Sequence, residues 1–305
     1  MDLIIEGLSK RYPNGVQALR DVSLTIRPGM FGLLGPNGAG KSTLMRTLAT
    51  LQEPDSGSVQ LGGLDVLRQK DEVRRLLGYL PQDFGVYPKV TAWEMLEHFA
   101  RLKGISSGKQ RREVVDALLR QTNLHQVSGK PLGSFSGGMR QRFGIAQALL
   151  GSPRLIIVDE PTAGLDPEER VRFHNLLSAI GEEVIVILST HIVSDVSDLC
   201  RDMAVINQGG VLLNGDPLQA VAALQGKIWR KFVGKADLAD HSARFPVISS
   251  RLFSGRTLIH VYAGERPDPS FEPANPELDD VYFATIRGKL GPPVAAAVPV
   301  ALGVG

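Results

Sequence analysis

The sequence predicts an α/β fold, because three apolar segments with the character of buried strands each lead into polar residues. Segment 31–34 precedes a glycine-rich loop, 35–43. Segment 155–158 ends in two carboxylates, and segment 184–188 is followed within three residues by a histidine. Uninterrupted apolar runs are typical of strands in a parallel sheet that is covered on both faces. Because such sheets bind ligands at the carboxyl ends of their strands, these polar residues form the candidate site.

The glycine-rich loop, GPNGAGKST, fits the template G-x-x-x-x-G-K-[ST] and stands between a strand and a run of helix-forming residues, 42–48. Its glycines let backbone N–H groups turn toward anionic oxygens at the N-terminus of that helix. Lys41 would neutralise the β- and γ-phosphates of a nucleotide, and the Ser42 hydroxyl would bind Mg²⁺. The predicted contacts are Asn37, Gly38, Gly40, Lys41, Ser42 and Thr43.

The composition narrows the class of protein. The chain has 305 residues, which suits one large domain or a large and a small one. Lys and Arg total 34 against 32 Asp and Glu, so the net charge of +2 argues against a nucleic-acid-coating protein. Cys200 is the only cysteine, which excludes an intrachain disulfide framework. We expect no secretory signal, and no apolar run reaches the roughly 18 residues of a membrane-spanning helix.

Before the loop, strands are expected at 3–5 and 22–26, with a turn at 10–15 between them. This turn contains Tyr12, whose ring could stack on a purine or could simply pack at the surface. After the loop, strands are expected at 59–61 and 76–80.

The chain then becomes helical between 91 and 150, where apolar residues recur at i, i+3 and i+4. Thr91 and Glu94 form a capping box ahead of the first helix. The block ends with Ser136-Gly137-Gly138, which opens another helix. This serine could bind phosphate at the helix N-terminus or could be an ordinary cap.

The strand at 155–158 ends in Asp159 and Glu160, and a buried strand ends in two carboxylates only where they have partners. Asp159 is placed to hold Mg²⁺, directly or through water. Glu160 can polarise the water that attacks a γ-phosphate. His191 follows the strand at 184–188, at the edge where ligands bind, and can hydrogen-bond a terminal phosphate.

The C-terminal part of the sequence has shorter apolar groups and a proline-rich link. Strands at 204–206 and 211–213 flank a hairpin signal. Further on, an apolar group at 258–262 and a helical pattern at 278–286 are separated by a proline-rich link, 266–276.

In this order, the motifs resemble those of the ATP-binding cassette (ABC) nucleotide-binding subunits over about residues 2 to 220. The matching residues are GPNGAGKST at 35–43, Gln82 as the Gln loop, FSGGMRQR at 135–142, IIVDEP at 156–161, AGLD at 163–166 and His191 as the switch histidine. The signature departs from the family's usual LSGGQ, with Phe135 for Leu and Met139 for Gln.

The resemblance implies a P-loop NTPase core with an antiparallel β-subdomain and an inserted helical subdomain at about 84–150, together forming a nucleotide-binding domain, 1–220. A small α+β extension, 221–290, would be an accessory region that regulates, dimerises or contacts a membrane partner. Residues 291–305 are predicted to be a disordered tail.

The resemblance also implies the roles of single residues. Tyr12 would stack on adenine, and Gln82 would join the metal site to the helical subdomain and assist catalysis with Glu160 and His191. Asp166 would couple two sites across an interface. The implied metal contacts are Ser42, Gln82 and Asp159.

The implied function is ATP hydrolysis that powers export through a separate transmembrane permease. Two cassettes, as a homodimer or a heterodimer, would each sandwich ATP and Mg²⁺ between one cradle and the other's Ser136, Gly137 and Gly138. The protein would lie peripherally at the cytoplasmic face of the membrane, where segment 84–88 contacts the permease, with no nucleic acid as partner. The alternative is a non-transport ABC ATPase that acts on nucleic acid or ribosomes. A P-loop regulator or kinase would leave the signature unexplained.

Overall fold

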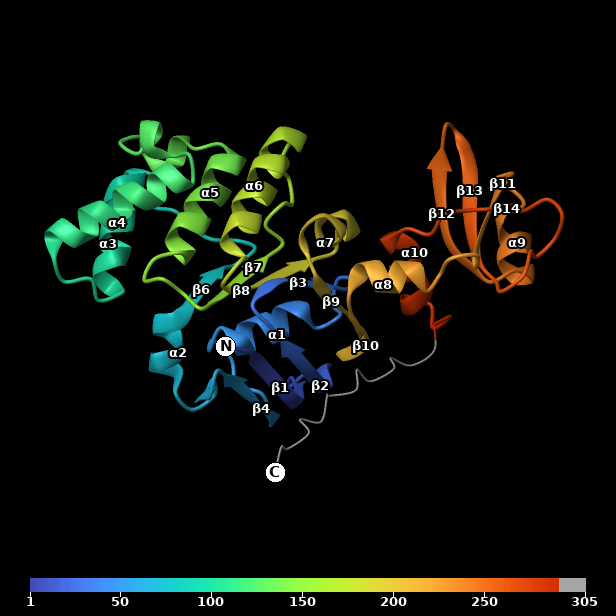
Figure 1. The fold of residues 1–305 in the computed structure, drawn as a ribbon, viewed down its shortest axis with the longest axis horizontal. Coiled ribbons are helices and arrows are strands. Elements are labelled where there is room, and N and C mark those ends of the chain that lie inside the picture. Colours follow the sequence, from blue (N-terminus) through green and yellow to red (C-terminus); the bar gives the residue numbers. More distant parts are fainter. Residues whose placement is uncertain (291–305) are drawn as a thin grey trace, which may run out of the picture. The chain divides into compact units, whose positions relative to one another are not determined.

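A computed structural model describes residues 1–290 (Figure 1). The tail predicted at 291–305 lies outside the described residues. The chain divides into two compact units, the first comprising residues 1–202 and 206–211, and the second comprising 203–205 and the chain from Leu212 on. Among the described residues, no helix combines the length and the apolar character needed to cross a membrane.

The first unit begins with an antiparallel sheet of order β2-β1-β4-β5. Its strands are β1 (Leu3–Arg11), β2 (Gln17–Ile26), β4 (Ser56–Leu61) and β5 (Leu64–Asp65). The predicted turn at 10–15 is too long, because Lys10 and Arg11 belong to β1. Both are held by Asp55, which accepts hydrogen bonds from Lys10 Nζ at 2.8 Å and from the Arg11 backbone N–H at 2.6 Å.

The central sheet has the order β10-β9-β3-β8-β7-β6. Its strands are β3 (Gly29–Leu34), β6 (Leu77–Leu80), β7 (Leu155–Asp159), β8 (Ile185–Thr190), β9 (Asp202–Asn207) and β10 (Gly210–Gly215). Strands β3, β8, β7 and β6 run parallel, and their register places Leu34 beside Thr190 and Asp159 beside Ser189. The polar ends of three predicted strands therefore meet at one edge of the sheet.

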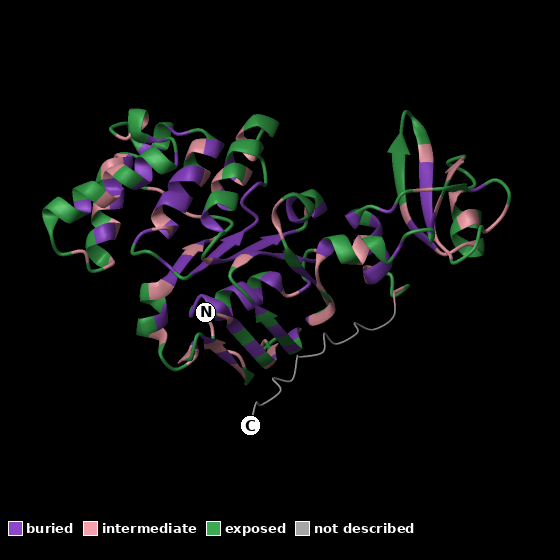
Figure 2. Ribbon diagram, viewed as in Figure 1, coloured by how far each residue is buried: buried purple, intermediate pink, exposed green. Residues whose placement is uncertain are grey.

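Strands β3, β7 and β8 of this sheet are almost wholly buried, as Figure 2 shows in purple. Helices pack against it: α1 (Lys41–Leu48), α2 (Lys70–Leu76), α5 (Gly137–Ala148), α6 (Pro167–Ile180) and α7 (Val193–Leu199). Leu76 ends α2 instead of starting a strand, so the strand predicted at 76–80 begins at Leu77. The α/β fold is confirmed.

The insert between β6 and β7 is helical and has its own core. It contains α3 (Ala92–Leu102), α4 (Gly108–Gln121), the 3₁₀ turns η1 (His125–Val127) and η2 (Leu132–Ser134), and α5. The predicted capping box is present, since Glu94 N donates to Thr91 Oγ1 at 3.2 Å and Thr91 N donates to Glu94 Oε2 at 3.0 Å. Phe135, one of the two departures from the family signature, is buried in this core. The larger ring therefore extends the core of the insert.

The second unit contains a four-stranded antiparallel sheet of order β12-β13-β11-β14. Its elements are α8 (Pro217–Ala222), β11 (Ile228–Val233), α9 (Leu238–Arg244), β12 (Val247–Phe253), β13 (Arg256–Tyr262), β14 (Glu272–Pro273) and α10 (Leu278–Ile286). The proline-rich link is not purely a linker, because β14 pairs with β11 and Phe271 is fully buried in the unit's core. Burial of an aromatic ring anchors this segment despite its prolines.

Candidate functional site

A cavity of about 330 Å³ lies at the carboxyl edge of the central sheet. It brings together all six predicted loop contacts, which come from one segment, with four predicted residues from elsewhere in the sequence. These four are Tyr12, Gln82, Glu160 and His191. Asp159 lies beside the cavity, at the end of β7.

The loop leaves β3 at Leu34 and enters α1 at Lys41. Gly40 has a left-handed backbone, with φ 109°, and no side chain of the described residues caps the helix. The first N–H groups of α1 therefore remain available to an anion, at the positive end of the helix dipole.

Lys41 is buried and donates through Nζ to the carbonyl oxygens of Gly35 at 2.7 Å and Pro36 at 3.3 Å. Burial lowers the pKa of Lys41, and the nearby carboxylates of Glu160 and Asp159 oppose this shift. A further anion at the loop would favour the charged ammonium in the same way.

Glu160 is a buried carboxylate of the site, with 7% of its surface exposed. Its Oε1 lies 3.7 Å from Lys41 Nζ, and its Oε2 lies 2.7 Å from Nδ1 of His191. The His191 ring is half exposed, so it forms the outer wall of this cluster. The backbone of Glu160 is left-handed, with φ 49°, a conformation that L-residues avoid unless their surroundings impose it.

Asp159 has the character of a cation ligand. It is buried, and its Oδ1 finds no hydrogen-bond partner within the described part of the chain. No group of three or more His, Cys, Asp or Glu side chains among residues 1–290 is arranged to hold a metal. A buried, unpartnered carboxylate oxygen fits Mg²⁺, an ion commonly held by one or two carboxylates together with nucleotide phosphates.

Tyr12 is fixed by its hydroxyl, which donates to Gln52 Oε1 at 2.9 Å and lies 3.2 Å from Thr43 Oγ1. These bonds attach the ring to the segment around α1 while it lines the cavity. Sequence reasoning missed Gln52, which lies 40 residues from Tyr12 and belongs to none of the motifs.

Besides Asp159, four predicted residues lie outside this cavity, namely Ser136, Gly137, Gly138 and Asp166. The Ser136 hydroxyl caps α5 by accepting from Met139 N at 3.2 Å, and the Asp166 carboxylate caps α6 by accepting from Glu169 N at 2.8 Å. Ser136, Gly137 and Asp166 are exposed. The structure therefore does not bring them to the phosphate-binding loop of the same chain.

Sequence reasoning also missed Asp195, a fully buried carboxylate four residues after His191. The available signal was its place between Val193 and Val196, since an acid inside a short apolar helical pattern requires buried partners.

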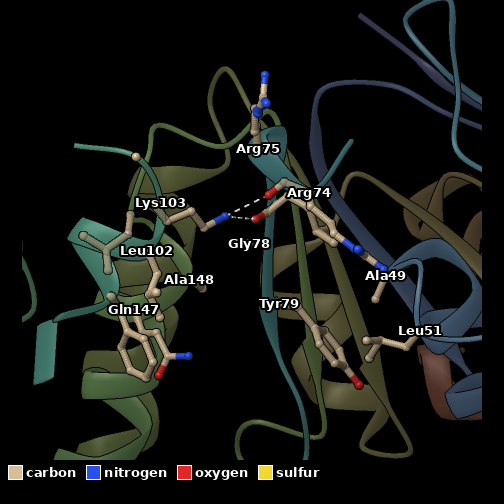
Figure 3. A pocket seen from close by; sticks show the side chains of 14 residues that line it. Ala49, Leu51, Arg74, Arg75, Gly78, Tyr79, Leu102, Lys103, Gln147 and Ala148 are labelled. Atoms are coloured by element: carbon tan, nitrogen blue, oxygen red, sulfur yellow. Dashed lines mark hydrogen bonds between the residues drawn. The ribbon is translucent and has the colours of Figure 1, made fainter. Parts of the chain in front are cut away.

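A second cavity, of about 590 Å³, lies where the helical insert meets the strands and helices of the core of the first unit (Figure 3). Lys103 crosses it and donates to the carbonyl oxygens of Arg74 at 2.9 Å and Leu77 at 2.8 Å. Its rim carries two exposed apolar side chains, Leu51 and Leu102, with 63% and 69% of their surfaces accessible.

Comparison with known proteins connects these features to a family. A family model described as ABC transporter matches residues 19–163. The Nod factor export ATP-binding protein I of Ralstonia nicotianae is 36% identical over 72% of this chain and 68% of its own length. The probable multidrug ABC transporter ATP-binding protein YbhF of Escherichia coli is 30% identical over 94% of this chain. The match spans only 52% of YbhF, so this chain covers about half of that relative.

A solved structure gives the same result. The dimeric, post-hydrolysis structure of the ATP-binding cassette MJ0796, bound to ADP and Pi, has a TM-score of 0.64 and 27% identity, and covers 70% of this chain and 98% of its own. The resemblance drawn from the motifs is thereby confirmed. The chain belongs to the ABC transporter ATP-binding proteins.

Proposed function

We propose that this chain hydrolyses ATP within a pair of cassettes and thereby drives export of a substrate through a separate membrane permease. The observation that carries the hydrolytic part is the position of Glu160, a buried carboxylate between Lys41 and His191 at the mouth of the phosphate-binding loop. A base in this position can accept a proton from water that approaches a terminal phosphate.

Each group in the cavity has a role in this proposal. Loop N–H groups and Lys41 bind the β- and γ-phosphates, Tyr12 stacks on adenine, and His191 hydrogen-bonds the γ-phosphate. Glu160 orients and deprotonates the attacking water, and Gln82 reports the occupied site to the helical insert.

Mg²⁺ would be held by Ser42 and Asp159, with Gln82 close by. The orphaned Oδ1 of Asp159 supports this assignment. When bound, the ion would neutralise charge on the phosphate oxygens.

A second cassette would complete the nucleotide site with the N-terminus of its own α5. Ser136 and Gly137 are exposed at the N-terminus of α5 and lie outside the cavity of their own chain, so they are free to contact a nucleotide held by another copy or by a related cassette. The MJ0796 cassette was solved as a dimer. Asp166, at the start of α6, would couple the two sites.

We place the permease on the helical insert, at the cytoplasmic face of the membrane. The cavity in Figure 3 has the mixed lining of a docking groove, with apolar rim residues and polar side chains such as Lys103 and Gln147. Segment 84–88, which contains the exposed Tyr87, is a second candidate contact with the permease. Export as the direction of transport is supported by the name of the Nod factor export protein.

Replacement of Glu160 by Gln tests the hydrolytic role. Glu160→Gln should abolish turnover and accumulate an ATP-bound dimer, which size-exclusion chromatography with Mg²⁺ and ATP would detect. Glu182→Gln, at an exposed carboxylate, is the matched control and should leave turnover unchanged. Turnover of Glu160→Gln near that of the unsubstituted protein would refute the assigned base.

Permease docking is tested by adding charge to the groove rim. Leu51→Asp and Leu102→Asp should each lower the amount of permease that copurifies from detergent-solubilised membranes, without loss of ATP binding. Val171→Asp places the same charge on another exposed apolar residue and should not affect copurification. Recovery of ribosomes or nucleic acid in place of a membrane protein would contradict the transport proposal.

A further inference from the structure

The Asp195 carboxylate is fully buried and accepts hydrogen bonds from four side chains. Oδ2 accepts from the hydroxyls of Thr162 at 2.6 Å and Thr190 at 3.3 Å. Oδ1 accepts from Arg170 Nε at 2.9 Å and lies 2.9 Å from Nε2 of His174. A buried charge persists only with such complete pairing, so these contacts define one rigid cluster.

The partners come from the segments that carry the catalytic groups. Thr162 lies two residues after Glu160, and Thr190 immediately precedes His191. Arg170 and His174 lie one turn apart on α6. One carboxylate thus fixes the segment after the proposed base to the end of the strand that carries the proposed phosphate ligand.

The electrostatics of the cluster agree with this description. Burial by itself raises the pKa of Asp195, but the hydrogen bonds from His174 and Thr162 and the positive charge of Arg170 outweigh it, so the pKa lies below its ordinary value. The carboxylate therefore remains ionised and keeps all four acceptor contacts near neutral pH.

The backbone of Glu160 needs such support. Its left-handed φ of 49° is unfavourable for a residue with a Cβ, and a strained residue persists where its neighbours are fixed. Before it, β7 fixes Asp159 beside Ser189, and the Glu160 N–H donates to the Ser189 carbonyl at 2.8 Å. After it, the side-chain anchor is Thr162 on Asp195.

We infer that Asp195 is a positioning residue for ATP hydrolysis, which acts through Thr162 and Thr190 to hold the Glu160 carboxylate and the His191 ring in their 2.7 Å contact. This inference rests on the proposed function of Glu160 and His191. Asp195 itself is not among the residues that line the cavity.

The experiment compares Thr162→Val, which keeps the shape and loses the hydroxyl, with Thr162→Ser, which keeps the hydroxyl. Thr162→Val should lower kcat roughly ten- to a hundredfold, because small displacements of reacting groups cost this much, while KM for ATP changes less than twofold. Thr162→Ser should restore most of the lost kcat. The control is Thr122→Val, which removes the hydroxyl bond of another buried threonine, to the Leu118 carbonyl, in the helical insert.

A second readout does not depend on hydrolysis. The chain has six histidines, so the ring signals of labelled protein can be assigned by His191→Gln. The His191 signal should move in Thr162→Val and stay in place in Thr162→Ser and Thr122→Val. If kcat and the His191 signal are both unchanged in Thr162→Val and only the melting temperature falls, Asp195 is merely structural and the inference is overturned. If the unsubstituted protein does not hydrolyse ATP but the signal moves as expected, the positioning role stands and the proposed function fails.

Discussion

Two glycines of the phosphate-binding loop allow a direct test of its geometry. Gly38 and Gly40 both have positive φ, 77° and 109°. A Cβ on Gly38 would meet no atom within 4 Å, whereas a Cβ on Gly40 would lie 2.4 Å from the carbonyl oxygen of Ala18 in β2. The substitutions Gly38→Ala and Gly40→Ala therefore share the backbone strain and differ in the collision.

The expected costs follow from these contacts. Backbone strain costs each variant about 1–2 kcal/mol, offset by about 0.4–1 kcal/mol from the stiffer unfolded chain. Displacing a backbone oxygen adds about 1–3 kcal/mol in Gly40→Ala, by analogy with overpacked cores. We expect net losses of about 1 kcal/mol for Gly38→Ala and about 3 kcal/mol for Gly40→Ala. For a unit of about 200 residues these correspond to decreases in Tm of about 2–4 °C and about 6–12 °C.

The assay is thermal unfolding followed by calorimetry, without nucleotide and then with ATP and Mg²⁺. ATP should raise the Tm of the unsubstituted protein, since a ligand that binds only the folded state stabilises it. Gly40→Ala should lose most of this increase, because the collision moves the start of α1. Equal decreases in Tm for the two variants without nucleotide would refute the predicted collision with the Ala18 carbonyl.

Three further predictions concern other groups of the site. In urea unfolding, Glu160→Gly should be more stable than Glu160→Ala by about 1 kcal/mol, because glycine adopts a left-handed backbone without strain and alanine does not. The opposite order of stability would contradict the left-handed conformation at this position. Tyr12→Phe loses a hydroxyl hydrogen bond worth about 0.5–1.5 kcal/mol and should weaken ATP binding about 2- to 10-fold in a fluorescent-nucleotide titration. An unchanged Kd would show that the bond from Tyr12 to Gln52 does not contribute to ATP binding. Asp195→Asn should lower the free energy of unfolding by about 3 kcal/mol at pH 7. Because the pKa of Asp195 is lowered in the folded state, the loss of stability is complete above the ordinary pKa of 3.8 and should shrink as pH falls through the folded-state pKa. Urea titrations that show the same loss at every pH would exclude the carboxylate as its cause.

The sequence alone predicted the features that short-range patterns encode. The loop around Lys41 is a contiguous motif, and the apolar run before Asp159 identifies both a buried strand and the edge at which it ends. The structure then placed Glu160 against Lys41 and His191, residues that are distant in the sequence. Parallel pairing explains this result, because it brings the carboxyl ends of β3, β7 and β8 to one edge.

The features that escaped prediction depend on long-range partners. The Asp195 cluster joins residues up to 33 positions apart, and its members follow no spacing rule. Lys10 and Arg11 are in a strand and not in a turn because they pair with Leu19 and Gln17 of β2. Asp55, 44 residues beyond Arg11, also binds both residues. Short helices such as α2 and α7 complete less than two heptads each, so their periodicity was too brief to identify.

One chain presents only part of the proposed ATP-binding site. The cavity contains the loop, the proposed base Glu160 and His191, but His191 is half exposed and Ser42 faces solvent. Electrostatic stabilisation of a phosphoryl-transfer transition state is strongest where water is excluded. The exposed helix N-terminus at Ser136 offers a surface of the kind that could cover such a cavity in another cassette. On the proposed function, closure of two cassettes would be the step that makes Glu160 effective, and hydrolysis would follow dimer formation with a steep dependence on cassette concentration.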